Sequence, residues 1–352
     1  MAKIRIAING FGRIGRQAFK IALTKPDLEV VAINDLTEPN VLAALLRYDS
    51  NYGPYDKVVG SDDKKERANP TTYSAGNIIV DNKKYPIFAE KDPGALPWKD
   101  LNVDVVLEST GRFITTEASS AHLKAGAKKV IISAPAKDEG VTPTFIIGVN
   151  HDKYANQQII SNASCTTNCI TPVIAVMHGK FGVKKMMMST IHSYTAEQNL
   201  VDGPPPGGKS NDLRRARAAA VNIIPTSTGA TIATTEAIPE LKGFLAGAAY
   251  RVPTPVGSLS DFTLIVNKKT TVDEINKAFE EAAKNPLWTN VLQVTKDPIV
   301  STDIIGNPHS AIVDLSLTQV VDGDMVKVVA WYDNEFGYSN RLVEEVIMVG
   351  KM

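Results

Sequence analysis

The residues of this 352-residue chain best suited to covalent chemistry are its two cysteines, which lie four residues apart in a hydroxyl-rich stretch. That stretch reads Ser161-Asn162-Ala163-Ser164-Cys165-Thr166-Thr167-Asn168-Cys169. A strand is predicted to end at Ser161, and Thr166 to Val176 is predicted to form the beginning of a helix, so Cys165 falls at a helix N-terminus. The helix dipole and the free N–H groups there stabilise a thiolate, the nucleophilic form of cysteine. The pattern favours a cysteine nucleophile, with two small buried hydrophobic residues as the alternative.

A thiol nucleophile needs a group that accepts its proton, and histidine suits this role near neutral pH. The five histidines are His122, His151, His178, His192 and His309. Only His192 lies in a strand-like segment that ends in hydroxyl-bearing residues, and its alternation with Met186 and Met188 gives these side chains one common face. We therefore expect His192 to be the base for Cys165, against the alternative of a structural histidine. Two cysteines without further Cys or closely spaced His do not make a zinc site.

A glycine pattern near the start of the chain predicts a site for a dinucleotide. Gly10, Gly12 and Gly15 stand between the alternating Ile4-to-Ile8 segment and a helix-forming run from Gln17 to Thr24. In this context the first glycine makes a tight turn, the second lets the backbone approach a pyrophosphate, and the third lets the helix pack closely. The N–H groups and the positive end of the helix dipole would face the anion. A coincidental turn is the alternative.

A carboxylate at the end of the second predicted strand strengthens this interpretation. Asp35 follows Gly15 by twenty residues, where it would bind the ribose hydroxyls of a dinucleotide and repel a 2′-phosphate. NAD is therefore favoured over NADP. Thr110 and Ser133 follow the next two predicted strands, so they lie at the carboxyl edge of the sheet, where they are either cofactor contacts or turn residues.

The composition excludes several classes of partner. Lys plus Arg and Asp plus Glu are equal at 38 each, so no net positive field is available to hold a nucleic acid. No apolar run approaches the roughly eighteen residues that cross a bilayer, so no membrane partner is expected. Two cysteines make no disulfide framework, and the start of the chain carries no export signal, so we expect a soluble, cytoplasmic protein.

The elements that must position these residues indicate two domains. Before residue 160, strand-like runs alternate with helix-compatible stretches, which predicts a parallel βαβ sheet. These runs are 3–8, 29–33, 103–107, 129–132 and 145–149, with hairpin-like pieces at 77–80 and 84–88. After Cys165 longer strands with fewer helices predict an α+β domain with a mostly antiparallel sheet. These strands are expected at 183–194, 246–252, 261–266, 311–314 and 325–331, with helices at 230–238, 271–284 and 337–352.

Taken together, these residues closely resemble the glyceraldehyde-3-phosphate dehydrogenase family. The motifs that carry the resemblance extend from the first strand to the last helix: residues 7–16, 161–168, 192–195, 212–217, 224–230, 251–254 and 331–338. The resemblance implies an α/β architecture with a Rossmann NAD-binding domain over 1–164, completed by a C-terminal helix 335–352, and a catalytic domain over 165–334. It also implies a homotetramer, in which residues 196–217 lie near the cofactor of a neighbouring subunit.

The same resemblance implies roles for individual residues. Cys165 resembles the family's nucleophile and His192 its base. The residues that match NAD contacts are Arg13, Ile14, Asp35, Ser133 and Asn334. The site for the substrate's own phosphate matches Thr195 and Arg251, and the site for the attacking phosphate matches Thr166, Thr228 and Gly229, with Arg215 close to both. The hydroxyl of Ser164 is expected to help handle phosphate.

Two departures from the family pattern bear on the cofactor. Lys91 stands where the family usually has an arginine near the adenine. The segment 203–208, Gly-Pro-Pro-Pro-Gly-Gly, differs from the shorter bacterial loop that helps to exclude a 2′-phosphate, and its composition predicts a loop. Lys91 is therefore not counted among the expected NAD contacts, and the second departure makes NAD selection less strict than Asp35 alone suggests.

The expected reaction is an oxidative phosphorylation. Cys165 attacks the aldehyde of glyceraldehyde 3-phosphate to form a thiohemiacetal, NAD takes the hydride, and inorganic phosphate releases the resulting thioester as 1,3-bisphosphoglycerate. One alternative is a dehydrogenase of the four-carbon aldehyde erythrose 4-phosphate with the same thiol and cofactor. Another is a non-catalytic NAD-binding redox sensor, in which Cys165 is oxidised to a sulfenic acid.

Overall fold

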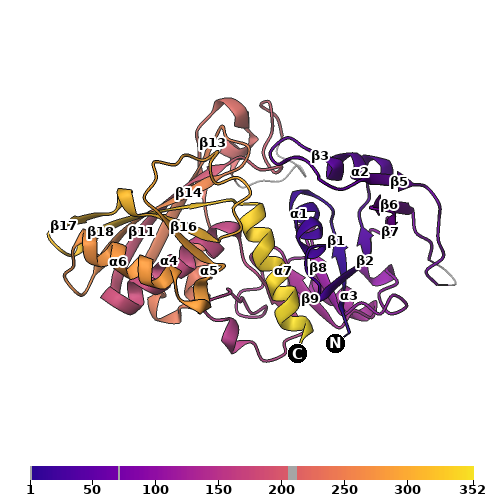
Figure 1. Ribbon diagram of the computed structural model, residues 1–352, viewed down its shortest axis with the longest axis horizontal. Helices are drawn as coiled ribbons and strands as arrows, with labels where there is room; N and C mark the ends of the chain where they lie inside the picture. The colour runs from indigo at the N-terminus through magenta and orange to yellow at the C-terminus, as the bar shows by residue number, and fades with distance from the viewer. Residues whose placement is uncertain (1, 70–71, 205–211) are drawn as a thin grey trace. The chain divides into compact units, whose positions relative to one another are not determined.

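The computed structural model of the chain describes residues 2–69, 72–204 and 212–352 and divides into two compact units (Figure 1). Unit 1 comprises Met1–Phe145, Lys153–Ala163 and Ser339–Met352, and unit 2 comprises Ile146–Asp152 and Ser164–Tyr338. Residues 146–152, Ser164 and residues 335–338, which the sequence assigns to the N-terminal domain, thus cluster with unit 2. Residues 205–211 of the expected proline-glycine loop lie outside the described residues.

Unit 1 is built on a twisted sheet of the Rossmann type. Within the described residues the strand order is β10-β9-β8-β1-β2-β7-β6-β5. The strands from β10 to β7 pair in parallel, whereas β6 and β5 form antiparallel hairpins at one edge, which confirms the predicted fold class. The strands of unit 1 are β1 (Ile4–Asn9), β2 (Leu28–Asn34), β3 (Tyr48–Asp49), β4 (Gly53–Pro54), β5 (Val59–Asp62), β6 (Gly76–Val80), β7 (Lys83–Phe88), β8 (Val105–Glu108), β9 (Lys129–Ile132) and β10 (Ile159–Ser161).

Alternation along these strands buries apolar side chains on both faces of the sheet. Ala7, Val106 and Val130 belong to one buried cluster, and their neighbours Ile8, Leu107 and Ile131 are also buried. Both faces therefore need covering helices, as is usual for parallel sheets. The helices with residues in unit 1 are α1 (Arg13–Ala22), α2 (Pro39–Arg47), α3 (Thr116–Lys124) and α7 (Phe336–Gly350).

The last helix returns to the first strand. A Cβ on Gly350 would lie 2.6 Å from the side chain of Ile4, so the end of α7 packs directly on β1. Lys129 Nζ donates a hydrogen bond to the carbonyl oxygen of Val349 at 2.6 Å, and Lys351 forms an ion pair with Asp27 at 2.8 Å. These contacts fix the C-terminal turn of α7 to the sheet of unit 1.

The strand predicted over 145–149 is wrong. The chain there forms consecutive turns, in which the N–H groups of Val149 and Asn150 donate to the carbonyl oxygen of Ile146. Gly148 has a φ of +86°, which a regular strand does not allow, and its carbonyl oxygen accepts from Trp288 Nε1 at 2.6 Å. The apolar run is a core-lining turn, which hydrophobicity alone does not distinguish from a short buried strand.

Unit 2 holds a mostly antiparallel sheet with the order β12-β13-β11-β14-β18-β16-β15 among the described residues, and β17 pairs with β18. The pairs β11/β13 and β15/β16 are parallel and the other pairs are antiparallel. The strands are β11 (Val183–Ser193), β12 (Ile224–Ser227), β13 (Leu245–Val252), β14 (Ser258–Val266), β15 (Leu292–Thr295), β16 (Ala311–Asp314), β17 (Gln319–Val321) and β18 (Met325–Tyr332). The predicted α+β class of this region is confirmed.

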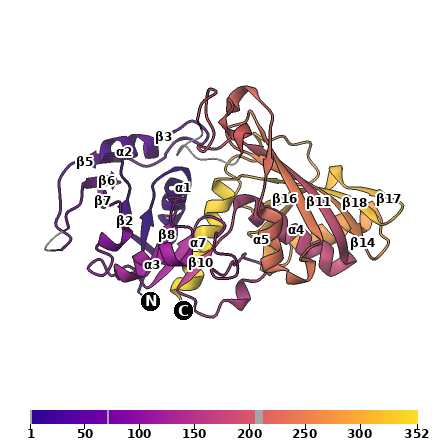
Figure 2. The same ribbon diagram turned by 180° about the vertical axis from the view of Figure 1, so that it is seen from behind.

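Three helices of unit 2 lie against the same face of this sheet (Figure 1), and two of them are also labelled in the view from behind (Figure 2). They are α4 (Cys165–Phe181), α5 (Ala230–Ala237) and α6 (Val272–Ala283). Met186, Met188, Thr190 and His192 alternate along β11 and are all buried, whereas Met187 between them is 68% exposed. The predicted common face of these side chains is therefore confirmed. No helix in the described part of the chain is long and apolar enough to cross a bilayer.

Candidate active site

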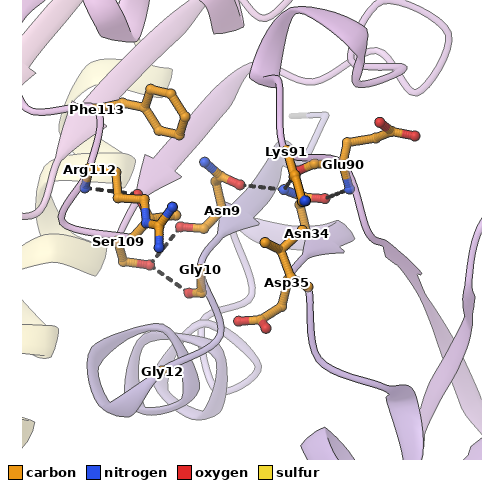
Figure 3. A pocket seen from close by; sticks show the side chains of 12 residues that line it. Asn9, Gly10, Gly12, Asn34, Asp35, Glu90, Lys91, Ser109, Arg112 and Phe113 are labelled. Atoms are coloured by element: carbon orange, nitrogen blue, oxygen red, sulfur yellow. Dashed lines mark hydrogen bonds between the residues drawn. The ribbon is translucent and has the colours of Figure 1, made fainter. Parts of the chain in front are cut away.

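A pocket of about 480 Å³ lies in unit 1 at the carboxyl ends of β1, β2 and β8 (Figure 3). Its lining residues are Asn9, Gly10, Gly12, Asn34, Asp35, Leu36, Glu90, Lys91, Ser109, Thr110, Arg112 and Phe113. Ligands of open parallel sheets bind at this edge because the loops that follow the strands meet there. The predicted residues Gly10, Gly12, Asp35 and Thr110 are thus brought together, and Lys91 joins them.

The three glycines have three different physical reasons to be glycine. Gly10 has a φ of +92°, and a Cβ there would lie 2.8 Å from the backbone nitrogen of Thr110. A Cβ on Gly15 would lie 2.0 Å from the carbonyl oxygen of Gly10, so only glycine lets α1 approach the turn this closely. A Cβ on Gly12 would meet no protein atom within 4 Å, so it would protrude into the pocket instead.

Asp35 is held rigidly at the end of β2. Its Oδ2 accepts the N–H of Phe11 at 2.8 Å, and its Oδ1 accepts the N–H of Thr37 at 2.9 Å. The first bond ties the carboxylate to the glycine turn itself. A carboxylate fixed in this way can accept hydrogen bonds from a diol and repels a phosphate, which is what the sequence analysis expects of Asp35.

A buried network beneath the pocket orients two of its lining residues. Glu108 accepts from Asn9 Nδ2 at 2.5 Å, from His122 Nε2 at 3.1 Å and from the N–H of Thr110 at 2.8 Å. Trp98 Nε1 donates to His122 Nδ1 at 3.0 Å, so the imidazole carries its proton on Nε2 and is neutral. Neither His122 nor Glu108 is predicted from the sequence to have a role in this site. Their burial is a tertiary effect that no local motif signals.

Five of the residues expected to contact NAD do not line this pocket, and one of them, Asn334, belongs to unit 2. Arg13 Nη1 pairs with Asp49 Oδ2 at 2.7 Å, Ile14 is half-buried on α1, and Gly15 lies beneath the turn. The N–H of Ser133 donates to the carbonyl oxygen of Glu108 at 2.9 Å. Their contacts with NAD therefore stay predictions.

The thiol and the imidazole meet in unit 2. Cys165 is the first residue of α4, and Ser164 caps that helix by accepting the N–H of Thr167 at 3.1 Å, so the predicted helix start is confirmed. Cys165 Sγ lies 3.4 Å from His192 Nε2. His192 Nδ1 lies 2.6 Å from the carbonyl oxygen of Ser193, which can only accept, so Nδ1 carries the proton. Nε2 of the neutral ring is therefore the acceptor for the thiol proton.

Burial decides the charge state of this pair. Burial, followed by the charge of Arg251, lowers the pKa of His192 to about 3. Burial also raises the pKa of the Cys165 thiol, while the charge of Arg251 and hydrogen bonds from Thr166 act in the opposite direction. The pair is thus a neutral thiol donating to a neutral imidazole. The helix N-terminus favours the thiolate form of Cys165, as expected from the sequence, but desolvation favours the neutral thiol. This burial results from tertiary packing and cannot be read from the local sequence.

Tyr332 is a member of this centre that the sequence analysis did not single out. Its hydroxyl lies 2.9 Å from Thr166 Oγ1 and 2.8 Å from Thr190 Oγ1, and its ring packs edge-on against His192. Two residues on, Asn334 Oδ1 accepts from Ser193 Oγ at 2.9 Å and from the N–H of Gly257 at 3.0 Å. The sequence did hold a signal for Tyr332. It follows the strand predicted over 325–331 and lies within the motif 331–338.

Two arginines extend the site, Arg251 from the sheet of unit 2 and Arg215 from a short 3-10 helix, Leu213–Ala216, that precedes β12. Arg251 of β13 donates from Nη1 to Thr195 Oγ1 at 3.0 Å, and Arg215 donates from Nε to Thr226 Oγ1 at 2.9 Å. Glu197, which the sequence analysis does not assign, accepts from both guanidinium groups. Thr228 and Gly229 lie at the N-terminus of α5, where Thr228 Oγ1 accepts the N–H of Ala230 at 3.2 Å. Guanidinium forks, hydroxyls and a helix start are groups that bind phosphate.

Comparison with known proteins gives a consistent result. A family model described as glyceraldehyde 3-phosphate dehydrogenase, NAD binding domain, matches residues 4–116, and one described as the C-terminal domain of the same family matches residues 164–334. The chain is 49% identical over 350 residues to glyceraldehyde-3-phosphate dehydrogenase 1 of Bacillus subtilis, covering 99% of this chain and 98% of that protein. It is 51% identical over 357 aligned positions to glyceraldehyde-3-phosphate dehydrogenase of Mycobacterium tuberculosis (strain ATCC 25618 / H37Rv), covering 99% of each.

The glycine geometry predicts different outcomes for two alanine substitutions. Gly12→Ala adds a methyl group that meets only the pocket, so thermal stability should stay within about 1 °C while NAD affinity falls at least about tenfold. Gly15→Ala forces α1 away from the turn, so the midpoint of thermal unfolding should fall by several degrees. Calorimetric NAD titration and thermal melting of both variants measure the two effects, and equal loss of stability in the two would contradict this account.

The thiol–imidazole contact predicts how alkylation of Cys165 depends on pH. His192→Asn removes the acceptor at 3.4 Å, so the alkylation rate at neutral pH should fall and its inflection should move to higher pH. Rates with iodoacetamide between pH 5 and 10 measure this shift, and His178→Asn serves as a histidine control in the same unit. Superimposable wild-type and His192→Asn profiles would rule out the pairing.

Proposed function

This chain belongs to the glyceraldehyde-3-phosphate dehydrogenase family, and we propose that it converts glyceraldehyde 3-phosphate, NAD and inorganic phosphate to 1,3-bisphosphoglycerate and NADH. The observation that carries the proposal is the 3.4 Å contact between Cys165 Sγ and His192 Nε2, together with Arg251, which stands opposite His192 in the same sheet and donates to Thr195 Oγ1. Cysteine nucleophiles paired with a base suit acyl transfer through a thioester. Both family domains are present in the chain.

NAD fits the pocket of unit 1 on structural grounds. The open space beside Gly12, the turn made by Gly10 and the fixed carboxylate of Asp35 match a pyrophosphate and a ribose diol. We propose that Arg13, Ile14, Thr110, Ser133 and Asn334 supply further contacts to the bound cofactor, which accepts the hydride in the oxidation. Asp35 favours NAD over NADP because a 2′-phosphate would meet its carboxylate.

Cys165 and His192 would carry out the bond-forming steps. The sulfur attacks the aldehyde carbon, and its proton moves to the carbonyl oxygen to give a thiohemiacetal. His192 Nε2 then accepts the hydroxyl proton as the hydride leaves, and a thioester on Cys165 remains. An oxygen of inorganic phosphate attacks the thioester carbon, the C–S bond breaks, and the thiol recovers its proton from the imidazole. Such a base typically contributes a factor of about 10²–10⁴ to the rate.

The anion-binding groups divide into two proposed sites. Thr195 and Arg251, joined by a hydrogen bond of 3.0 Å, would bind the phosphate of the substrate. Ser164, Thr166, Thr228 and Gly229 would bind the attacking phosphate, with Arg215 serving both. The hydroxyls of Ser164 and Thr166 lie beside Cys165 at the start of α4, where an anion is also favoured by the helix dipole.

We also propose a homotetramer that works in the cytoplasm. Apolar side chains stand exposed on unit 2, with Leu200 at 77% and Leu213 at 77%, and Met187 on β11 is likewise exposed. Apolar side chains this exposed are suited to burial against another copy of the chain. Both cysteines are free, and a free nucleophilic thiol requires a reducing compartment.

Substituting the sulfur tests the proposed function directly. Cys165→Ser should reduce NADH formation from glyceraldehyde 3-phosphate by at least about 10⁴-fold, because the hydroxyl is a far weaker nucleophile, and NAD affinity should change less than about twofold. Cys169→Ser, one turn deeper and buried, is the control and should keep most of the activity.

The wild-type assay includes erythrose 4-phosphate, NADP, and reactions without inorganic phosphate. Substantial turnover by Cys165→Ser would exclude the covalent route. A ratio of NADH to enzyme that never exceeds one would favour the redox sensor instead, and faster turnover of the four-carbon aldehyde would reassign the substrate.

The proposed assembly predicts a mass of about four times 38.0 kDa by light scattering on a sizing column. Met187→Lys places a charge at an exposed apolar position of β11, so it should shift the protein toward smaller species. A wild-type mass equal to one chain at micromolar concentration would refute the assembly.

A further inference from the structure

We propose that Glu197 competes with phosphate for the two anion-binding arginines, so that an incoming phosphate has to displace its carboxylate. The proposal rests on the proposed function in assigning Arg215 and Arg251 to phosphate. It adds a carboxylate that pairs with both arginines and, by competing with the anion, sets the affinity of the site for phosphate.

The contacts place one carboxylate oxygen between two cations. Glu197 Oε1 lies 2.7 Å from Arg215 Nη1 and 3.1 Å from Arg251 Nη2. Phosphate and carboxylate oxygens both accept from guanidinium forks, so the two anions compete for the same donors. A phosphate that binds both arginines must therefore displace this shared carboxylate oxygen.

The arginines are held by the protein, whereas the carboxylate has room to leave. Arg251 also donates to Thr195 Oγ1 and to the carbonyl oxygen of Ser193, and its side chain is 12% exposed. Arg215 also donates to Thr226 Oγ1, and its side chain is 25% exposed. Glu197 lies in a turn after β11 with half of its side chain exposed. A ligand can therefore replace the carboxylate without moving the guanidinium groups far.

The charge balance gives this exchange a consequence for affinity. Burial lowers the pKa of the Arg251 guanidinium, the charge of Glu197 acts against this, and the charge of Arg215 adds to it. Glu197 thus neutralises part of the repulsion between two arginines when no phosphate is bound. Without it, the empty site would carry more positive charge and hold phosphate more tightly, which would also slow the release of a phosphorylated product.

A structural role for Glu197 predicts the opposite sign. If the carboxylate is needed to hold the arginines in place, its removal should weaken phosphate binding. If it competes, its removal should strengthen binding. The sign of the change in affinity therefore separates the two roles.

The test compares Glu197→Gln with a matched control, Asp202→Asn. Asp202 Oδ2 pairs with Arg217 Nε at 2.7 Å in the same segment, and both of these side chains are exposed, so the control removes one charge without touching Arg215 or Arg251. Calorimetric titration with inorganic phosphate at low salt should give a Kd about three- to tenfold lower for Glu197→Gln, because a competing charge-assisted contact is gone. Asp202→Asn should stay within about twofold of wild type.

Kinetics give a second readout. The KM for inorganic phosphate should fall with the Kd in Glu197→Gln, while kcat should not increase. An unchanged or higher Kd, or an equal fall in Asp202→Asn, would overturn the proposal. The titration needs no turnover, so a wild-type protein inactive on glyceraldehyde 3-phosphate would refute the proposed function and leave this test intact.

Discussion

The hydrogen bond between the thiol of Cys165 and Nε2 of His192 is the interaction on which the rest of the structure depends. Its geometry comes from two independent elements. The Ser164 cap fixes where α4 begins and therefore where Sγ lies. The carbonyl oxygen of Ser193 fixes the proton of His192 on Nδ1, so Nε2 faces the sulfur as an acceptor. Either element alone would leave a buried polar group without its partner.

Register in the sheet of unit 2 joins this reaction centre to the anion-binding groups. His192 of β11 stands opposite Arg251 of β13 in a parallel pair, so the proposed base and the proposed phosphate ligand project from neighbouring positions. Arg251 influences the pKa of both members of the thiol pair because it lies so close to them. A slip of one residue in this register would turn the two side chains to opposite faces and separate the functions. Sheet pairing is therefore the constraint that makes chemistry and phosphate recognition one site.

The sequence was most informative where function is built into local backbone geometry. The glycines at 10, 12 and 15, the helix start at Cys165 and the alternation around His192 each follow from a short pattern with one physical meaning. The turn at 145–149 was not predicted, because a continuous run of buried apolar residues has no periodicity that distinguishes a turn from a strand. The sequence also did not predict the roles of Tyr332, Glu108 and Glu197, because these roles depend on partners that are distant in the sequence. The charge state of Cys165 depends on burial, which only the folded chain provides.

The account is tested most directly by trapping the covalent intermediate. Enzyme mixed with glyceraldehyde 3-phosphate and NAD in the absence of inorganic phosphate should be quenched in acid within milliseconds and digested for mass spectrometry. The account predicts that the peptide containing Cys165 gains the mass of a 3-phosphoglyceroyl group and loses it when phosphate is added before the quench. NADH formation without any acyl mass on that peptide would contradict the central role of the thiol.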